Sequence, residues 1–99
     1  MSLVHLSMAA LHDLNSIDAY TVRQWGDAQA DRYLNRLQSC FNRLAENPLL
    51  GRECQAIRPG LRRIEQDKHV IFNRKTEDGI RVSRILHRGM LPDRHSIDD

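Results

Sequence analysis

The sequence predicts an α+β domain in which a hairpin of two helices packs on a small antiparallel sheet. Two observations predict this class: a helical first half that stops at Asn47-Pro48, and a second half in which turn signals separate strand-like segments. Two amphipathic helices with almost no linker between them must fold back on each other. Their shared apolar face then needs a sheet to cover. The expected order is one short strand, two helices and three strands, β-α-α-β-β-β.

The first half contains the short strand and both helices. Val4-His5-Leu6 alternates as a strand would, and Ser7 is a suitable N-cap for a helix over residues 8–24. Gly26 ends this helix, and a second helix is expected over residues 27–46. Apolar or small residues recur at intervals of three and four along both helices: Ala10, Leu14, Ile17 and Thr21, then Ala30, Tyr33, Leu34, Leu37, Cys40, Phe41 and Leu44.

The second half predicts a loop followed by three strands. Residues 49–57 read as a loop, and Pro59-Gly60 reads as a turn. The last expected strand has apolar residues on both faces near its end, which favours a central position. With the helices on one face of the sheet, the opposite face is left to Arg and His. The strands are expected over residues 61–66, 68–75 and 80–87, with a tight turn near Asp67 and a hairpin turn over residues 77–79.

Composition excludes several classes of protein. The 99 residues carry a net charge of +2, which suits a single small globular domain over residues 1–99 better than an obligate nucleic-acid binder. No apolar run is long enough to span a membrane and no secretory signal opens the chain, so a cytoplasmic location is expected. Cys40 and Cys54 are expected to be reduced and structural. His5 and His12 lack metal-ligand spacing, so no metal or cofactor is expected.

The positive charge lies in the second half, and most of it is arginine. Residues 1–57 carry five Arg against six acids, whereas residues 58–95 carry eight Arg and two Lys against five acids. An arginine fork binds carboxylates and phosphates alike. The charge therefore favours an acidic partner without choosing between protein and nucleic acid.

Several segments, in this order and at these spacings, resemble the ParE branch of the ParE/RelE toxin superfamily. The most specific are Trp25-Gly26, "LAENPLLGR" from Leu44, "HVIFNR" from His69 and "RILHRGM" from Arg84, within a match from about Ser7 to His95. The resemblance implies the same order of elements and the toxin half of a toxin–antitoxin pair. It implies that the chain inhibits DNA gyrase and is neutralised by a ParD-like antitoxin, and that DNA is bound only through the antitoxin. A homodimer and a toxin–antitoxin heterotetramer are both left open.

The sequence departs from the family pattern at two places. Asn73 stands where the family usually has an aromatic residue, so any contact that depends on that ring is in doubt. Residues 1–3 are poor family sequence and are expected to be an added or disordered start, and residues 91–99 are expected to form a tail. A chain that has lost its target and only binds antitoxin is one alternative, and Asn73 is the hint for it.

A second alternative is a RelE-like, ribosome-dependent endoribonuclease. Cleavage of RNA by its 2′-hydroxyl needs a base, an acid and cations to stabilise the phosphorane. The chain has these residue types but lacks the dense Lys/Arg set and the C-terminal Tyr or paired His expected of RelE-like enzymes, so a non-enzymatic toxin is preferred. The candidate acids and bases are His69, His87 and His95, and the candidate phosphate ligands are Arg62, Arg74, Arg84 and Arg88.

Two sets of contact residues follow from the toxin interpretation. Trp25 is assigned to packing at the helix junction, and Met90 to an exposed apolar anchor beside Arg88. The toxic segment that would contact gyrase consists of Arg84, His87, Arg88, Met90 and His95. The antitoxin-binding set consists of the groove residues Tyr33, Leu37 and Phe41 with Arg58, Arg62, Arg63 and Arg74.

Overall fold

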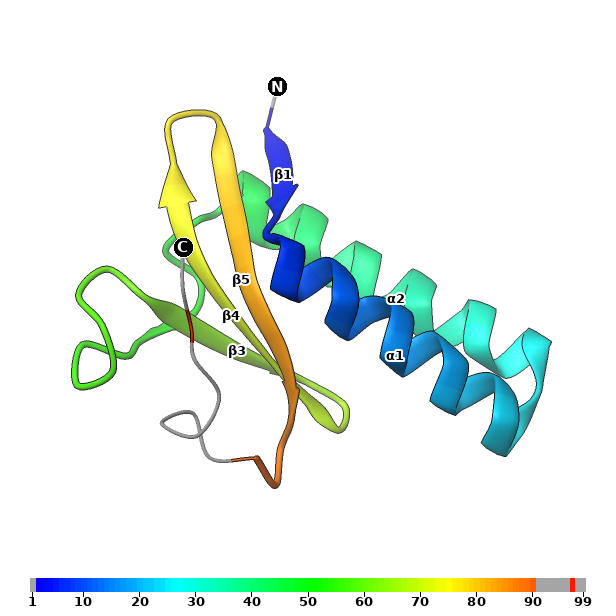
Figure 1. The fold of residues 1–99 in the computed structure, drawn as a ribbon. Helices are drawn as coiled ribbons and strands as arrows, with labels where there is room; N and C mark the ends of the chain where they lie inside the picture. Colours follow the sequence, from blue (N-terminus) through cyan, green and yellow to red (C-terminus); the bar gives the residue numbers. More distant parts are fainter. Residues whose placement is uncertain (1, 91–96, 98–99) are drawn as a thin grey trace.

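The computed structural model describes residues 2–90 and residue 97. Two helices and a five-stranded mixed sheet make up these residues, in the order expected from the sequence with one additional short strand (Figure 1). The elements are β1 (Leu3–Leu6), α1 (Met8–Trp25), α2 (Asp27–Glu46), β2 (Arg52–Glu53), β3 (Arg62–Gln66), β4 (His69–Thr76) and β5 (Gly79–His87).

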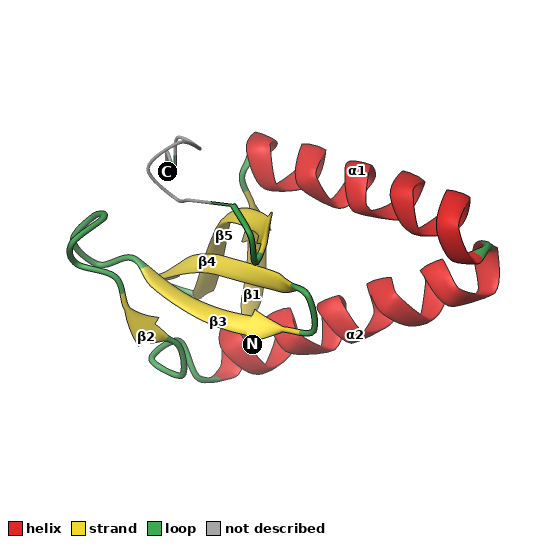
Figure 2. Cartoon of the chain, turned by 90° about the horizontal axis from the view of Figure 1, so that it is seen from below, coloured by secondary structure: helices red, strands yellow, loops and turns green. Residues whose placement is uncertain are grey.

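Local signals account for the ends of both helices. The Ser7 side chain accepts a hydrogen bond from the Ala10 amide at 2.9 Å, as an N-cap does, and donates one to the Ser83 carbonyl at 2.7 Å. Gly26 separates the helices with φ of 88°, a backbone conformation that favours glycine. The hairpin extends well beyond the sheet (Figure 2). Trp25 lies at its far end and is 66% exposed, so the packing expected of it there is wrong.

The sheet has the strand order β1-β5-β4-β3-β2. β5 is an interior strand, as its apolar residues on both faces predicted, and it pairs with β4 in antiparallel and with β1 in parallel register. The sheet is therefore mixed, not wholly antiparallel. β2 was expected to be loop; it pairs with β3 over two residues, too few to leave a periodic signal.

The first residues of β1 and β5 lie very close to each other. Leu3 pairs with Gly79, and a Cβ atom at Gly79 would lie 1.9 Å from the Leu3 carbonyl oxygen, so only glycine fits there. Leu3 thus belongs to β1, inside the segment for which a disordered start was expected. The tight turn between β3 and β4 is confirmed, with Asp67 at φ of 55°.

The two faces of the sheet carry separate apolar clusters. The helix face points toward α2 and carries a core of twelve buried residues, including Leu37, Phe41 and Ile71. On β4, Val70 and Phe72 alternate with Ile71 and therefore point to the second face. There they pack with Leu61, Leu86 and Ile97. The expectation that the second face holds only Arg and His is wrong, because a second, smaller core lies on it.

Candidate functional site

A hollow of about 190 Å³ lies on the second face, next to the smaller core. Val70, Phe72 and Leu86 form its apolar floor. It brings residues of both predicted contact sets together, because Arg63 from β3 meets the segment that follows β5. The remaining lining residues are Glu65, His87, Arg88 and Met90. We call this site the second-face hollow.

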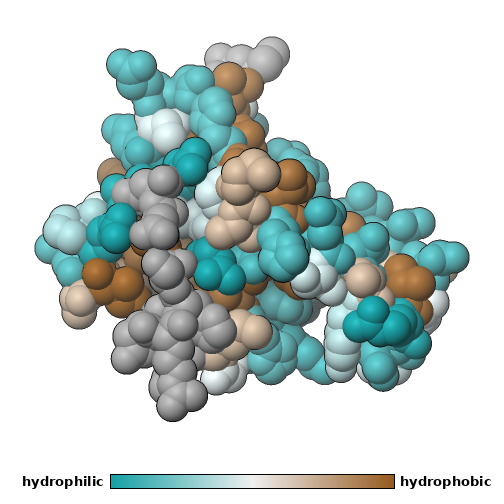
Figure 3. Space-filling model, viewed as in Figure 1, coloured by the Kyte–Doolittle hydropathy of each residue, from teal (hydrophilic) through white to brown (hydrophobic). Residues whose placement is uncertain are grey.

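On the surface of the molecule, small apolar groups lie next to charged side chains. On the face drawn in Figure 3, the visible apolar side chains lie in several small groups among hydrophilic ones. A small apolar floor with charged and flexible residues at its edge is the arrangement expected of a protein contact, in which a central apolar anchor is surrounded by polar groups. Met90, 44% exposed, lines the hollow together with Arg88.

Charges at the edge of the hollow are held loosely. The Glu65 carboxylate lies 3.5 Å from Arg88 through one oxygen and 3.5 Å from Arg52 through the other. All three side chains are substantially exposed, so these ion pairs contribute little to stability. The ion pair with Glu65 therefore holds Arg88 only weakly.

The backbone after β5, in contrast, is fixed. The Arg88 amide donates to the Lys68 carbonyl at 2.9 Å and the Met90 amide to the His87 carbonyl at 2.9 Å. The Gly89 amide donates to Nδ1 of His87 at 3.2 Å, which places the proton of the neutral His87 ring on Nε2. These bonds hold residues 87–90 as a turn that presents Arg88 and Met90 at the hollow.

Arg84 lies on β5, before this turn, and is not part of the open surface. Its guanidinium forms a two-pronged ion pair with Asp13 of α1 at 2.8 and 2.9 Å, and the Arg84 side chain is only 18% exposed. The same carboxylate accepts the Ile85 amide at 2.9 Å. The hydrogen bonds to Asp13 raise the pKa of Arg84. Asp13 thus joins α1 to β5.

The sequence analysis missed Asp13, although a signal was present. Asp13 lies on the same helical face as Ala10 and Ile17, among residues that are buried. A carboxylate in the buried stripe of an amphipathic helix requires a partner, since an unpaired buried charge is costly.

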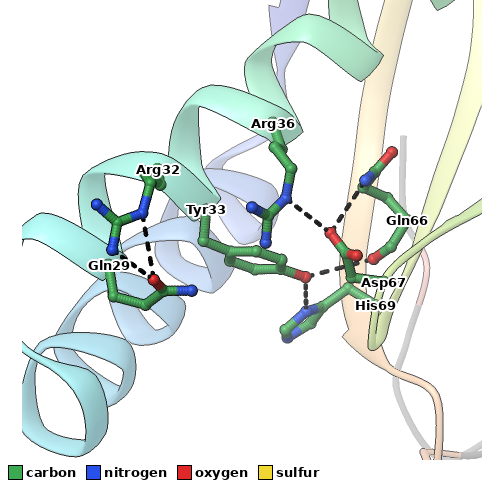
Figure 4. A network of polar contacts seen from close by, with 7 residues as sticks. All are labelled: Gln29, Arg32, Tyr33, Arg36, Gln66, Asp67 and His69. Atoms are coloured by element: carbon green, nitrogen blue, oxygen red, sulfur yellow. Dashed lines mark hydrogen bonds and ion pairs between the residues drawn. The ribbon is translucent and has the colours of Figure 1, made fainter.

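Tyr33, His69 and His87 form a second polar group at the end of the sheet. The Tyr33 hydroxyl lies 2.5 Å from Nδ1 of His69, and the rings of His69 and His87 are 5.8 Å apart. Figure 4 shows Tyr33 between Arg36 and His69, with Arg36 and Gln66 both directed at Asp67. Burial, followed by the charge of Asp67, raises the pKa of Tyr33 to about 12. Burial, followed by His87, lowers the pKa of His69, so both groups are neutral near pH 7.

The predicted antitoxin-binding residues do not form one surface. Leu37 and Phe41 are completely buried in the helix-face core, and Tyr33 packs against the same core. They do not line an open groove, since α1 and the sheet cover them. Arg62 donates to the carbonyls of Leu49 and Gly51 and contacts Glu53, so it anchors the loop after α2. Arg58, Arg63 and Arg74 are the other members of this set, and Arg63 lines the second-face hollow.

The residues considered for RNA cleavage are dispersed in the same way. Among the described residues, His69 and His87 are adjacent to each other. Arg62 and Arg84, however, are engaged elsewhere, with backbone carbonyls and with Asp13 respectively. His95 lies outside the described residues. Asn73 is fully buried, with its amide donating to the Ile71 carbonyl, so this position faces the interior and not a ligand.

Residues 2–90 and 97 give no support for a metal site or for a membrane-spanning helix. No group of three or more His, Cys, Asp or Glu side chains in this part of the chain could hold a metal ion. Neither helix described is long and apolar enough to cross a membrane. Cys40 and Cys54 are both free thiols, and burial raises the pKa of each.

Comparisons with known proteins agree on one family. Residues 4–92 match the profile of the "ParE toxin of type II toxin-antitoxin system, parDE". "Toxin ParE1" of Mycobacterium tuberculosis is 44% identical over 91 residues, covering 91% of this chain and 93% of that protein. "Toxin ParE1" of Caulobacter vibrioides is 38% identical over 86% of this chain and 88% of its own length. "Toxin ParE" of Escherichia coli is 34% identical over 86% and 84%.

A solved structure has the same fold. It is described as the "Chromosomal ParDE TA system from P. aeruginosa" and superposes with a TM-score of 0.74 over 88% of this chain and 96% of that one. The sequence identity is 19%, so this likeness concerns the fold alone.

Proposed function

Because the chain belongs to the ParE toxin family of type II toxin–antitoxin systems, we propose that it inhibits DNA gyrase and that a ParD-like antitoxin neutralises it by direct binding. The match of residues 4–92 to the family, with relatives above 30% identity over most of their length, is the observation that carries this proposal. Gyrase acts on DNA in the cytoplasm, so the toxin acts there too and arrests replication.

The second-face hollow is the surface that we assign to gyrase. Arg88 and Met90 supply a cation and an exposed apolar side chain on a turn whose backbone is fixed by hydrogen bonds. His87 holds that turn through Gly89. Arg84 contributes indirectly, since its ion pair with Asp13 positions β5. His95 stays in the proposed toxic segment on sequence grounds.

For the antitoxin we propose contact through arginines of the second half. Arg58, Arg63 and Arg74 can bind carboxylates of an acidic antitoxin segment. Leu37 and Phe41 would meet an antitoxin only if the helix hairpin moved, because both are buried. The proposed contact therefore rests on the arginines and on the edge of the second-face hollow.

We propose that the toxin acts by binding and not by catalysis. Endoribonuclease activity is the second candidate, and the adjacency of His69 and His87 is the observation that favours it. Two features oppose it: Nδ1 of each ring already has a hydrogen-bond partner, and Arg62 and Arg84 are engaged away from the two rings.

The test is a plasmid cleavage assay with purified toxin, gyrase and ATP, in which trapped gyrase yields linear DNA after denaturation. We expect linear DNA with the wild-type chain and none when cognate antitoxin is added. Arg88→Ala and Met90→Ala should each reduce the linear product about tenfold, as expected for hot-spot residues. Arg32→Ala removes an exposed arginine of α2 whose guanidinium donates to Gln29 on the same helix; it is the matched control and should behave as wild type.

Two results would contradict parts of this proposal. No linear DNA with folded wild-type chain would remove gyrase as the target. Ribosome-bound messenger RNA would then be examined for cuts that His69→Ala abolishes, which is the outcome expected of an endoribonuclease. Wild-type potency in Arg88→Ala would leave gyrase as the target but remove the second-face hollow as its contact surface. A chain that binds antitoxin without arresting growth would be an inactive remnant.

A further inference from the structure

Ile97 occupies a site of its own on the second face of the sheet. It is 5% exposed and packs with Leu61, Val70, Phe72 and Leu86, seven residues beyond Met90 in the sequence. In Figure 1 the short red segment at residue 97 lies in front of the sheet, over β3. We call the pocket formed by these four residues the Ile97 site.

The apolar floor of this site continues past Ile97. Val70, Phe72 and Leu86 belong to the same apolar cluster as Ile97 and also line the second-face hollow. The hollow, about 190 Å³ in volume, therefore lies over the part of this apolar floor that Ile97 does not line. An occupant longer than one isoleucine side chain would fill both the Ile97 site and the hollow.

The charge around the floor selects an acidic occupant. Arg63 and Arg88 line the hollow, and Arg52 and Arg88 share a single carboxylate, Glu65. Three arginines against one glutamate leave a local charge of +2. In the sequence, Ile97 is followed by Asp98 and Asp99, so the chain itself joins a branched aliphatic residue to carboxylates at this point. Arginine forks bind carboxylates through two parallel hydrogen bonds.

We infer that the Ile97 site is a docking site for an acidic protein segment that carries a branched aliphatic side chain, and that Ile97 occupies this site in the free chain. For its biological role the inference rests on the proposed antitoxin binding, since an antitoxin with such a segment would have to displace Ile97. A residue tethered close to its site has an effective concentration in the millimolar range, so a partner that fills the hollow as well can outcompete it.

The test uses the full-length chain and a synthetic peptide with the sequence of residues 91–99, LPDRHSIDD. Methyl NMR follows Val70 and Leu86 at the Ile97 site, with Ile71 on the helix face as the internal reference. We expect the peptide to shift the Val70 and Leu86 methyl signals of Ile97→Ala and Ile97→Asp chains with a Kd at least tenfold lower than that of the wild-type chain. The Ile71 signal should not move, and a peptide with Asp in place of Ile should not bind.

Cys40→Ala is the matched control, because it removes buried atoms from the helix-face core and leaves the Ile97 site occupied. It should bind the peptide as weakly as the wild-type chain. Equal affinity in wild-type and Ile97 variants, or no shift at saturating peptide in a folded Ile97→Ala chain, would overturn the inference. Loss of cooperative unfolding in Ile97→Ala would overturn it as well, since Ile97 would then be a core residue that no partner can displace.

The peptide experiment contains neither gyrase nor antitoxin. Failure of the plasmid assay therefore leaves this inference intact, and failure of peptide binding leaves the proposed gyrase inhibition intact.

Discussion

The two faces of the sheet are covered in different ways. The helix face is covered by both α1 and α2, and twelve of the described residues form its core. The second face has five buried residues, contributed by the strands, by Leu61 before β3 and by Ile97. The helix face is thus closed by elements with their own regular hydrogen bonding, whereas the second face is closed by short segments. A face closed by short segments is the one that a partner can use.

Truncation of one leucine on each face should show the difference in packing between the two faces most clearly. Leu37→Ala, in the helix-face core, should lower the free energy of unfolding by about 3 kcal/mol, because it leaves a cavity that rigid helices cannot fill. Leu86→Ala, on the second face, should cost about 2 kcal/mol, since loosely held neighbours can collapse into the space. Urea titration at equilibrium measures both values. A larger loss for Leu86→Ala would mean that the second face is the better packed of the two.

Removal of one charge should then test the link between α1 and β5. Asp13→Asn keeps an acceptor for the Ile85 amide but removes the negative charge that Asp13 presents to the Arg84 guanidinium, which is only 18% exposed. Hydrogen bonds to charged groups are worth about 1.5–3 kcal/mol each when lost, and we expect a loss of about 2 kcal/mol. Urea titration gives the stability, and the plasmid assay should show weaker gyrase trapping if Arg84 positions the 87–90 turn. Asp18→Asn, on the same helix, is the control and should cost less than 0.5 kcal/mol.

The smallest effect should come from pH, through His69. Its pKa is lowered in the fold, first by burial and then by the neighbouring His87, so the unfolded chain binds a proton more readily than the folded chain. The contribution of neutral His69 to the free energy of unfolding is therefore complete above the pKa of the unfolded chain, about 6.5. It is lost as the pH falls toward the pKa of the folded chain. Stability should decrease from pH 7.5 to pH 5.5, and the decrease should be smaller in His69→Gln. His12→Gln, on the exposed side of α1, should keep the wild-type slope; a wild-type slope in His69→Gln would remove His69 as its source.

Elements with local signals were predictable from the sequence. α1 and α2 end where the Ser7 cap, Gly26 and the Asn47-Pro48 stop placed their ends, to within one residue. The strands and the turn at Asp67 follow from alternation and turn residues. Their type and order could be predicted because each signal lies within a few residues of the structure that it specifies.

Features that depend on distant residues could not be predicted. Periodicity identified the apolar face of α2, but it does not say that Leu37 and Phe41 are covered. Trp25 follows the pattern of a junction residue, yet the hairpin projects past the sheet and leaves it exposed. The Asp13–Arg84 pair joins residues 71 positions apart, and no local pattern reports such a contact. The part of the candidate site that could be predicted was the basic segment after β5, because its charge and its family resemblance are both local.

The parallel pairing of β1 with β5 has a consequence for the timing of synthesis. β1 and the start of α1 are translated first, but their partners, Gly79 to Ile85, are translated more than seventy residues later. The helix-face core cannot close on a nascent chain until β5 has left the ribosome, because contacts between distant residues must wait for both ends. The chain therefore acquires its folded surface only after β5 has been synthesised, which gives the cell an interval in which the first helices exist and the folded toxin does not.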